Sequence, residues 1–199
     1  MITKMKKYIA FFLCGAMILS GCSTMSKMAQ DSLIGTGAGA IIGDKMDKKA
    51  AELAELENAQ VETIEDANGL KAIKVTFDSG ILFALNKADL NAASKANLAK
   101  FASQMADMPE TDITIYGHTD NTGSDAVNEK LSLQRANSVS TLLQNNGIAK
   151  SRITAEGKSY SMPVATNETA EGRAQNRRVE VYISANEDMI KAAEAAAAK

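Results

Sequence analysis

The spacing of hydrophobic and polar residues predicts alternating strands and helices over residues 71–183. Runs that are typical of strands, either alternating or wholly apolar, occupy residues 73–77, 81–83, 113–116, 152–156 and 179–183. A helix with its apolar side chains on one face is indicated over residues 91–108. A longer helix over residues 124–145 is followed by Gly147, a residue typical of helix ends. Strands separated by helices favour an α/β sandwich.

The segment before this pattern favours a helix. Residues 44–65 are rich in strong helix formers and contain no Pro or Gly. A helix of this length would extend about 33 Å at 1.5 Å per residue, so we interpret residues 44–68 as a helical stalk or linker. The alanine-rich tail, residues 186–199, favours a weak helix without a core pattern. We expect it to be an accessory to one globular domain over residues 69–185.

The first 21 residues have the layout of a secretory signal. Basic residues at Lys4, Lys6 and Lys7 precede an apolar run over residues 9–19. This run is too short for a membrane-spanning helix, which needs about 20 apolar residues. We therefore expect residues 1–21 to be removed.

The end of this segment, Leu19-Ser20-Gly21-Cys22, resembles the bacterial lipobox. The resemblance implies cleavage before Cys22, attachment of a diacylglycerol to its thiol and acylation of the new amine. Cys14 lies in the removed segment, so the mature chain would carry one thiol and no disulfide. Attachment of the lipid explains why a secreted chain keeps a single cysteine with no disulfide partner.

Three glycines, Gly35, Gly39 and Gly43, recur every four residues after the lipobox. On a helix they would line one face and let another helix or a lipid surface approach closely. A flexible glycine linker is the open alternative. A dinucleotide-binding loop would need a preceding strand, and the upstream sequence indicates none. We expect residues 22–43 to be a lipidated N-terminus with a glycine zipper.

The charge balance of the mature chain argues against one class of partner, nucleic acids. Without the three lysines of the signal, 19 of the 22 basic side chains remain against 24 acidic ones, a formal charge of −5. This balance argues against non-specific nucleic-acid binding. About 178 residues with few aromatics and no Trp suit one domain with a modest core.

The helix over residues 127–143 carries two polar side chains on its apolar half. That half consists of Val127, Leu131, Ala136, Val139, Leu142 and Leu143. Asn128 and Arg135 lie among them, nearly superposed because they are seven residues apart. The Arg135 guanidinium needs a partner there, because an unpaired charge in a low-dielectric position costs several kcal/mol.

The nearest partner in sequence is Asp120, directly after one predicted strand and before this helix. A turn would place its carboxylate beside the first helical turns, where backbone N–H groups also favour an anion. Asp120, Asn128 and Arg135 are therefore expected to converge. The spacing leaves open whether they form a binding site or whether Asp120 and Arg135 simply pair with each other.

Three motifs resemble the signature of OmpA-like peptidoglycan-binding domains. They are Gly117-His118-Thr119-Asp120-x-x-Gly123, Asn128-x-x-Leu131-Ser132-x-x-Arg135-Ala136 and Asn176-Arg177-Arg178-Val179-Glu180. The resemblance covers about residues 71–183 and implies an α+β fold, a βαβαβ two-layer sandwich with a mixed sheet. Lipobox, glycine repeat and stalk together are most similar to YiaD-type lipoproteins.

In this family the ligand is the meso-diaminopimelate of the wall's stem peptide, whose free end is a zwitterion. The resemblance assigns the ammonium to Asp120 and the carboxylate to Arg135, which can clamp it bidentately. Thr122 and Asn128 would add neutral hydrogen bonds, and Arg177 would lie near the edge of the site.

Asn86 matches a further contact position, in the loop after the first strand. This loop, Phe83-Ala84-Leu85-Asn86-Lys87, departs from the Phe-Asp that is common in relatives. Ala84 stands there instead, and it has no polar side chain to make a contact.

These features predict a lipoprotein that binds peptidoglycan non-covalently, without a cofactor or metal, and tethers the outer membrane to the wall from the periplasmic side. Two charge-assisted bonds of roughly 1.5–3 kcal/mol each support millimolar to micromolar affinity, which suits a tether held beside a repetitive wall. Ser23 favours the outer membrane, because the lipoprotein family associates aspartate at that position with inner-membrane retention.

Other functions remain open. The glycine segment could self-associate in the membrane, or the chain could be a scaffold for envelope proteins, with the wall domain only as an anchor. Catalysis by His118 with Asp120 and Ser124 or Ser132 is disfavoured, because His118 is the only histidine and the sequence has no metal-ligand cluster. We expect no enzyme.

Overall fold

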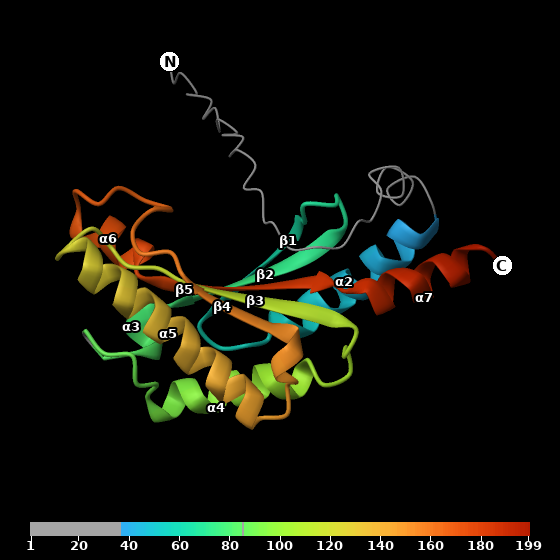
Figure 1. Ribbon diagram of the computed structural model, residues 1–199, viewed down its shortest axis with the longest axis horizontal. Helices are drawn as coiled ribbons and strands as arrows, with labels where there is room; N and C mark the ends of the chain where they lie inside the picture. Colours follow the sequence, from blue (N-terminus) through green and yellow to red (C-terminus); the bar gives the residue numbers. More distant parts are fainter. Residues whose placement is uncertain (1–36, 85) are drawn as a thin grey trace, which may run out of the picture.

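A computed structural model describes residues 37–84 and 86–199 (Figure 1). The expectations for the signal segment, Cys22 and Gly35 lie outside these residues. None of the helices in the described part of the chain combines the length and the apolar character needed to cross a membrane.

Five strands form one mixed sheet. They are β1 (Ala59–Glu65), β2 (Lys71–Asp78), β3 (Thr111–Gly117), β4 (Ile153–Gly157) and β5 (Arg178–Ala185). Their order across the sheet is β1-β2-β5-β3-β4, with β3 and β4 parallel and the other neighbours antiparallel. The helical elements are α2 (Gly37–Leu53), α3 (Ser79–Leu82), α4 (Ala92–Gln104), α5 (Asp125–Asn145), η1 (Lys150–Arg152), α6 (Ala170–Asn176) and α7 (Glu187–Ala197).

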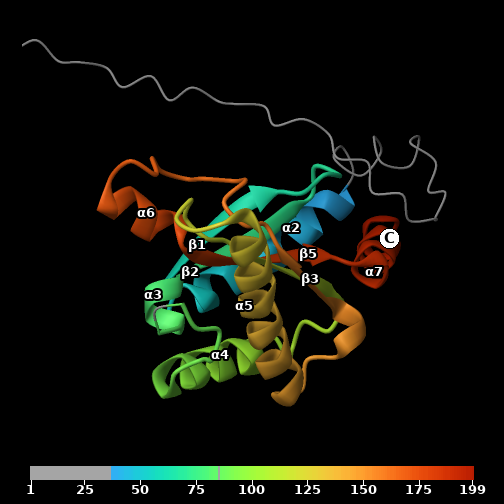
Figure 2. The same cartoon turned by 60° about the vertical axis from the view of Figure 1, so that its left-hand side comes forward.

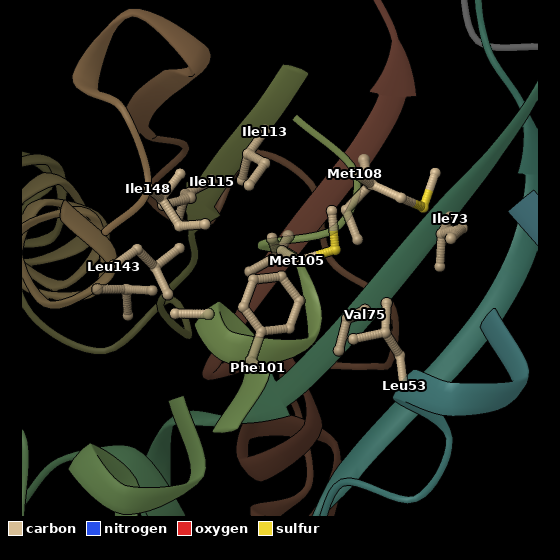
Figure 3. Packing of buried hydrophobic residues seen from close by; sticks show 14 of the residues in the cluster. Leu53, Ile73, Val75, Phe101, Met105, Met108, Ile113, Ile115, Leu143 and Ile148 are labelled. Atoms are coloured by element: carbon tan, nitrogen blue, oxygen red, sulfur yellow. The ribbon is translucent and has the colours of Figure 1, made fainter. Parts of the chain in front are cut away.

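The core lies between one face of the sheet and the helices that cover it (Figure 2). Alternate strand residues supply the buried apolar side chains of this face: Ile73, Val75, Phe77, Ile113, Ile115, Val179, Val181 and Ile183. Phe101 and Met105 at the end of α4, together with Leu143 of α5, pack against them (Figure 3). The intervening residues on the other face, such as Thr76, Tyr116 and Tyr182, are only half-buried. The predicted α+β sandwich with a mixed sheet is confirmed.

The predicted strand at residues 81–83 is wrong. Residues Ser79–Leu82 form the short helix α3, capped by the Asp78 side chain, which accepts a hydrogen bond from the Gly80 N–H. Of the expected strand only an isolated bridge between Phe83 and Leu90 remains. This cap ends β2, because the Asp78 carboxylate takes the Gly80 N–H, which is then not available for hydrogen bonding to a neighbouring strand.

The predicted helical stalk is also wrong. Helix α2 ends at Leu53, and Ala59–Glu65 is the edge strand β1, paired antiparallel with β2. The helix is not a free spacer either, because its buried side chains belong to the core. They follow a helical stripe: Ala38, Ile42, Met46, Ala50 and Leu53. Helix propensity alone could not distinguish this packed helix from an exposed one.

The C-terminal tail forms α7 and does carry a core pattern, contrary to the expectation. Met189 and Ala193, one helical turn apart, are buried. The helix runs beside α2, and a Cβ built on Gly37 would lie 3.3 Å from Ala197 Cβ. Small residues therefore allow the two helices to approach closely.

The glycine repeat is partly used inside the fold. Gly39 and Gly43 line a hollow beside the turn that joins β1 and β2, and Gly43 is buried. A Cβ at Gly43 would lie 3.9 Å from Lys71 Cε. The face of α2 that carries Gly43 thus lies against the β1–β2 hairpin of the same chain.

Candidate functional site

Three neighbouring strands reach the same end of the sheet and bring the site residues together. Ser79 follows β2, Arg177 precedes β5, and Thr119 and Asp120 come soon after β3. Backbone hydrogen bonds continue this alignment beyond the strands: the Ser79 N–H donates to the Arg177 carbonyl at 3.0 Å, and the His118 N–H to the Arg178 carbonyl at 2.9 Å. The order β2-β5-β3 therefore sets these residues side by side.

Helix α5 reaches this strand end because Gly117 has no side chain. A Cβ at Gly117 would lie 2.1 Å from the carbonyl oxygen of Ser132 and 2.9 Å from its carbonyl carbon. Only glycine permits this approach of backbone to backbone. It aligns Asn128 and Arg135 with the end of β3.

An open cleft of about 740 Å³ lies at this end of the sheet. All six residues predicted for the binding site line it: Asn86, Asp120, Thr122, Asn128, Arg135 and Arg177. Apolar side chains of Phe83, Val127 and Leu131 form part of the wall. Val127, expected on the buried half of its helix, is 57% exposed because the first turn of α5 borders this cleft.

Asp120 is buried and fully engaged. Its Oδ1 accepts hydrogen bonds from the Thr122 N–H at 2.9 Å and from the Thr122 hydroxyl. Its Oδ2 pairs with Arg177 Nη1 at 2.5 Å. Burial by itself would raise the pKa of Asp120, but the bonds from Thr122 and Arg177 outweigh it and lower the pKa below its ordinary value. Asp120 is therefore a carboxylate at neutral pH.

Arg135 is 4% exposed and forms no ion pair with any described residue. Its Nε donates to the Lys87 carbonyl at 3.1 Å, and its Cζ lies 5.2 Å from the centre of the Phe83 ring. Burial lowers the pKa of Arg135, and the positive charge of Arg177 lowers it further. The alternative in which Asp120 and Arg135 simply pair is wrong, because Arg177 takes the carboxylate.

Asn128 orders the loop before α5. It is 3% exposed, and its Nδ2 donates to the Thr122 carbonyl at 3.1 Å. This bond ties α5 to the turn that holds Asp120, while Thr122 itself stays exposed at the mouth of the cleft.

Asn86 lies in the loop after α3 and is exposed. It has a φ of 55°, a left-handed conformation that Asn tolerates better than most residues.

Sequence reasoning missed three polar residues of the cleft. Arg173, on α6, lines it, and its Nη1 donates to the Asn167 and Glu168 carbonyls. The hydroxyls of Ser79 and Thr119 are buried and have no hydrogen-bond partner within the described residues. Thr119 belongs to the motif at residues 117–123, but nothing in the sequence indicated that its hydroxyl would find no partner among the described residues.

His118 lies apart from the cleft. It is 1% exposed, and its Nε2 is 3.2 Å from Oε2 of Glu180, which also pairs with Arg178 at 2.8 Å. Burial would raise the pKa of Glu180, but His118 and Arg178 hold it down to about 2. The arrangement gives His118 a structural partner in Glu180, and among the described residues no hydrogen bond joins its side chain to a serine. Across residues 37–84 and 86–199, no group of His, Cys, Asp and Glu could hold a metal ion.

The matching family model is described as the OmpA family and covers residues 82–177. Probable lipoprotein YiaD of Escherichia coli K12 is 33% identical over 210 residues, which span 88% of this chain and 96% of YiaD. Outer membrane porin F of Pseudomonas aeruginosa is 43% identical over 123 residues, and the peptidoglycan-binding protein ArfA of Mycobacterium bovis 39% over 113. These matches cover 60% and 57% of this chain, but only 35% of each relative.

Among solved structures, the cell wall anchor of the type VI secretion system (T6SS) from Pseudomonas aeruginosa is 32% identical, with a TM-score of 0.59. The similarity covers 71% of this chain and 97% of that one. The names of these relatives describe wall-binding, wall-anchoring and outer-membrane proteins. Together with the near-complete match to YiaD, these similarities show that the chain belongs to the OmpA family.

Proposed function

We propose that this chain binds peptidoglycan non-covalently through the cleft, as a lipoprotein held in the outer membrane and facing the periplasm. The proposed ligand is the free end of the diamino acid in the stem peptide, which carries an ammonium and a carboxylate. ArfA and the secretion-system anchor, whose names refer to the peptidoglycan or the wall, support the class of ligand.

The observation that carries this proposal is the Arg135 guanidinium. It is buried in the wall of an open cleft, and no described carboxylate pairs with it. A charge removed from water without an ion-pair partner is costly unless a ligand supplies one. A ligand carboxylate fits this position, because guanidinium groups bind carboxylates bidentately.

The remaining contacts fit the other parts of the diamino acid. Asp120 stays ionised and would attract the ligand ammonium, although Arg177 already shares its Oδ2. Thr122 and Asn128 would add hydrogen bonds from the loop before α5. Phe83, Val127 and Leu131 offer an apolar surface to the methylene chain between the two ends of the diamino acid. Binding without catalysis suits this set, since His118 faces Glu180 instead.

The position of the cleft fits a membrane tether. The N-terminal end of α2, blue in Figure 1, lies near the C-terminus, at the opposite end of the molecule from α3 and α6, whose residues line the cleft. The 14 residues between Cys22 and Gly37 can span at most about 50 Å. A lipid on Cys22 would therefore keep the domain near the membrane, attached at the end of the domain opposite the cleft.

The test is titration of the folded protein with soluble wall fragments. Arg135→Ala should abolish binding at working concentrations, since the ligand carboxylate loses its counter-charge. Arg135→Lys should restore only part of the affinity, because an ammonium cannot bind bidentately. Lys130→Ala is the matched control, because Lys130 is an exposed cation of the same helix and does not line the cleft. A wild-type dissociation constant for folded Arg135→Ala would show the assignment to be wrong.

A further inference from the structure

The cleft carries more positive than negative charge. Among its described lining residues, Asp120 is the single acid and Arg135, Arg173 and Arg177 are basic, a formal charge of +2. The whole chain has the opposite balance, −2, so the surplus is local. A zwitterionic ligand end adds no net charge and would leave this surplus uncompensated. A ligand with additional negative charge would be attracted more strongly.

Two guanidinium groups in the cleft have N–H donors that no described residue accepts. Arg177 bonds Asp120 through Nη1 only, and Arg135 bonds Lys87 through Nε only. Their other guanidinium nitrogens have no hydrogen-bond partner within residues 37–84 and 86–199. The two cations also repel each other: after burial, the charge of Arg177 is the second cause that lowers the pKa of Arg135. An anion between or beside them would relieve this repulsion.

Two buried hydroxyls lie at the same strand end as Arg177. Ser79 is 1% exposed and Thr119 is 4% exposed, and neither hydroxyl bonds a described residue. The strand order places Arg177 between them, since β5 runs between β2 and β3. Buried hydroxyls without a partner are rare, because each costs free energy, and a hydroxyl can donate to a carboxylate.

We propose that Ser79, Thr119 and Arg177 form a second carboxylate subsite beside Arg135. This inference rests on the proposed function and narrows its ligand. A stem peptide that ends at its diamino acid carries the zwitterionic end and, on the same residue, a second free carboxylate. The cleft should prefer this form, because the second carboxylate compensates part of the remaining positive charge.

The experiment compares two soluble tripeptides that end at the diamino acid, one with its terminal carboxylate free and one with it amidated. The amide keeps the zwitterionic end and nearly the same shape but removes one negative charge. Titration of the full chain in detergent should give about tenfold or greater preference for the free acid. Arg177→Gln should bring the ratio of the two dissociation constants near one. The ratio cancels any general loss caused by the broken Asp120 pair.

Variants of Ser79 and Thr119 test whether their hydroxyls belong to the second carboxylate subsite. Thr119→Val keeps the shape of the side chain and Ser79→Ala removes a single atom, so both should fold and both should reduce the preference several-fold. Lys130→Gln should leave the ratio unchanged, since it removes an exposed charge outside the cleft.

The outcomes separate this inference from the proposed function. Equal affinity of the wild type for both peptides, with wall binding retained, would overturn the second subsite and leave the proposed function standing. An unchanged ratio in both hydroxyl variants would remove Ser79 and Thr119 from the subsite. No binding of either peptide or of the wall by the wild type would overturn the proposed function and this inference with it.

Discussion

Asp120 is paired with Arg177, whose Nη1 lies 2.5 Å from its Oδ2, and not with Arg135 on the facing helix. The cleft therefore holds a carboxylate that is already paired and a buried guanidinium, Arg135, that forms no ion pair with a described residue and feels Asp120 only through its charge. The ligand ammonium must therefore share Asp120 with Arg177 or displace it. The ligand carboxylate meets no such competition at Arg135.

Asp120→Asn should remove wall binding and also lower the free energy of unfolding by about 1–2 kcal/mol. The amide cannot balance Arg177, and the cleft then holds three cations without an acid. Co-sedimentation with purified peptidoglycan and denaturant titration measure the two effects. Asp125→Asn, an exposed acid at the start of α5, should change neither by much. Wall binding at the wild-type level by folded Asp120→Asn would contradict the proposed role.

Glu180 should make the protein less stable in acid. Its folded-state pKa is held down to about 2, below the ordinary value of 4.5, so its contribution is present above pH 4.5 and is lost as the pH falls toward 2. The shift corresponds to about 3 kcal/mol at most. Denaturant titration between pH 6 and 2.5 should show this loss. In Glu180→Gln the loss over this range should be smaller by most of that amount, since Glu180 is not fully protonated at pH 2.5, and an unchanged pH dependence would argue against the low pKa.

Gly117→Ala should destabilise the fold by about 1–3 kcal/mol or more and weaken wall binding. The new Cβ would collide with the backbone of Ser132 at 2.1 Å, so α5 must move away from the strand end and take Asn128 and Arg135 with it. Gly43→Ala is the control, because its Cβ meets Lys71 at 3.9 Å, an ordinary contact. That variant should gain up to about 1 kcal/mol from helix propensity. Thermal unfolding of both variants provides the comparison.

Leu53→Ala should lower the free energy of unfolding by about 2–5 kcal/mol, because α2 is part of the core. Leu53 is fully buried and packs near Val75, as Figure 3 shows. A stalk residue would tolerate the change. Lys48→Ala, on the exposed side of the same helix, should alter stability by less than about 0.5 kcal/mol. Similar unfolding midpoints for the two variants would restore the stalk interpretation.

Cys22→Ser should leave a protein that still binds the wall but no longer partitions with membranes. Acyl chains provide the anchor at about 0.8 kcal/mol per buried CH₂, and the substitution removes them. Fractionation of cells after digestion of the peptidoglycan measures the change. Persistence of the variant in washed outer membranes would rule out the lipid as the anchor.

The sequence by itself predicted four of the five strands of the sheet and six of the residues that line the cleft, but neither the edge strand β1 nor the part played by Ser79, Thr119 and Arg173. Strand alternation is a local signal, so the strands at residues 113–116 and 179–183 could be predicted from their own side chains. Asn128 and Arg135 stood out because two polar residues recurred on an apolar helix face. The motif around Asp120 supplied the rest through its resemblance to a known family.

Only the tertiary structure decided which side chains and segments of the chain contact each other. Whether residues 44–53 form a stalk or a packed helix depends on what covers Ile42 and Met46, and propensity carries no such information. The pairing of Asp120 with Arg177 depends on β5 lying between β2 and β3, a contact between residues 57 positions apart. The hydroxyls of Ser79 and Thr119, which have no partner among the described residues, follow from the same strand order, since a hydroxyl's partner is set by which segments meet and not by its neighbours in sequence.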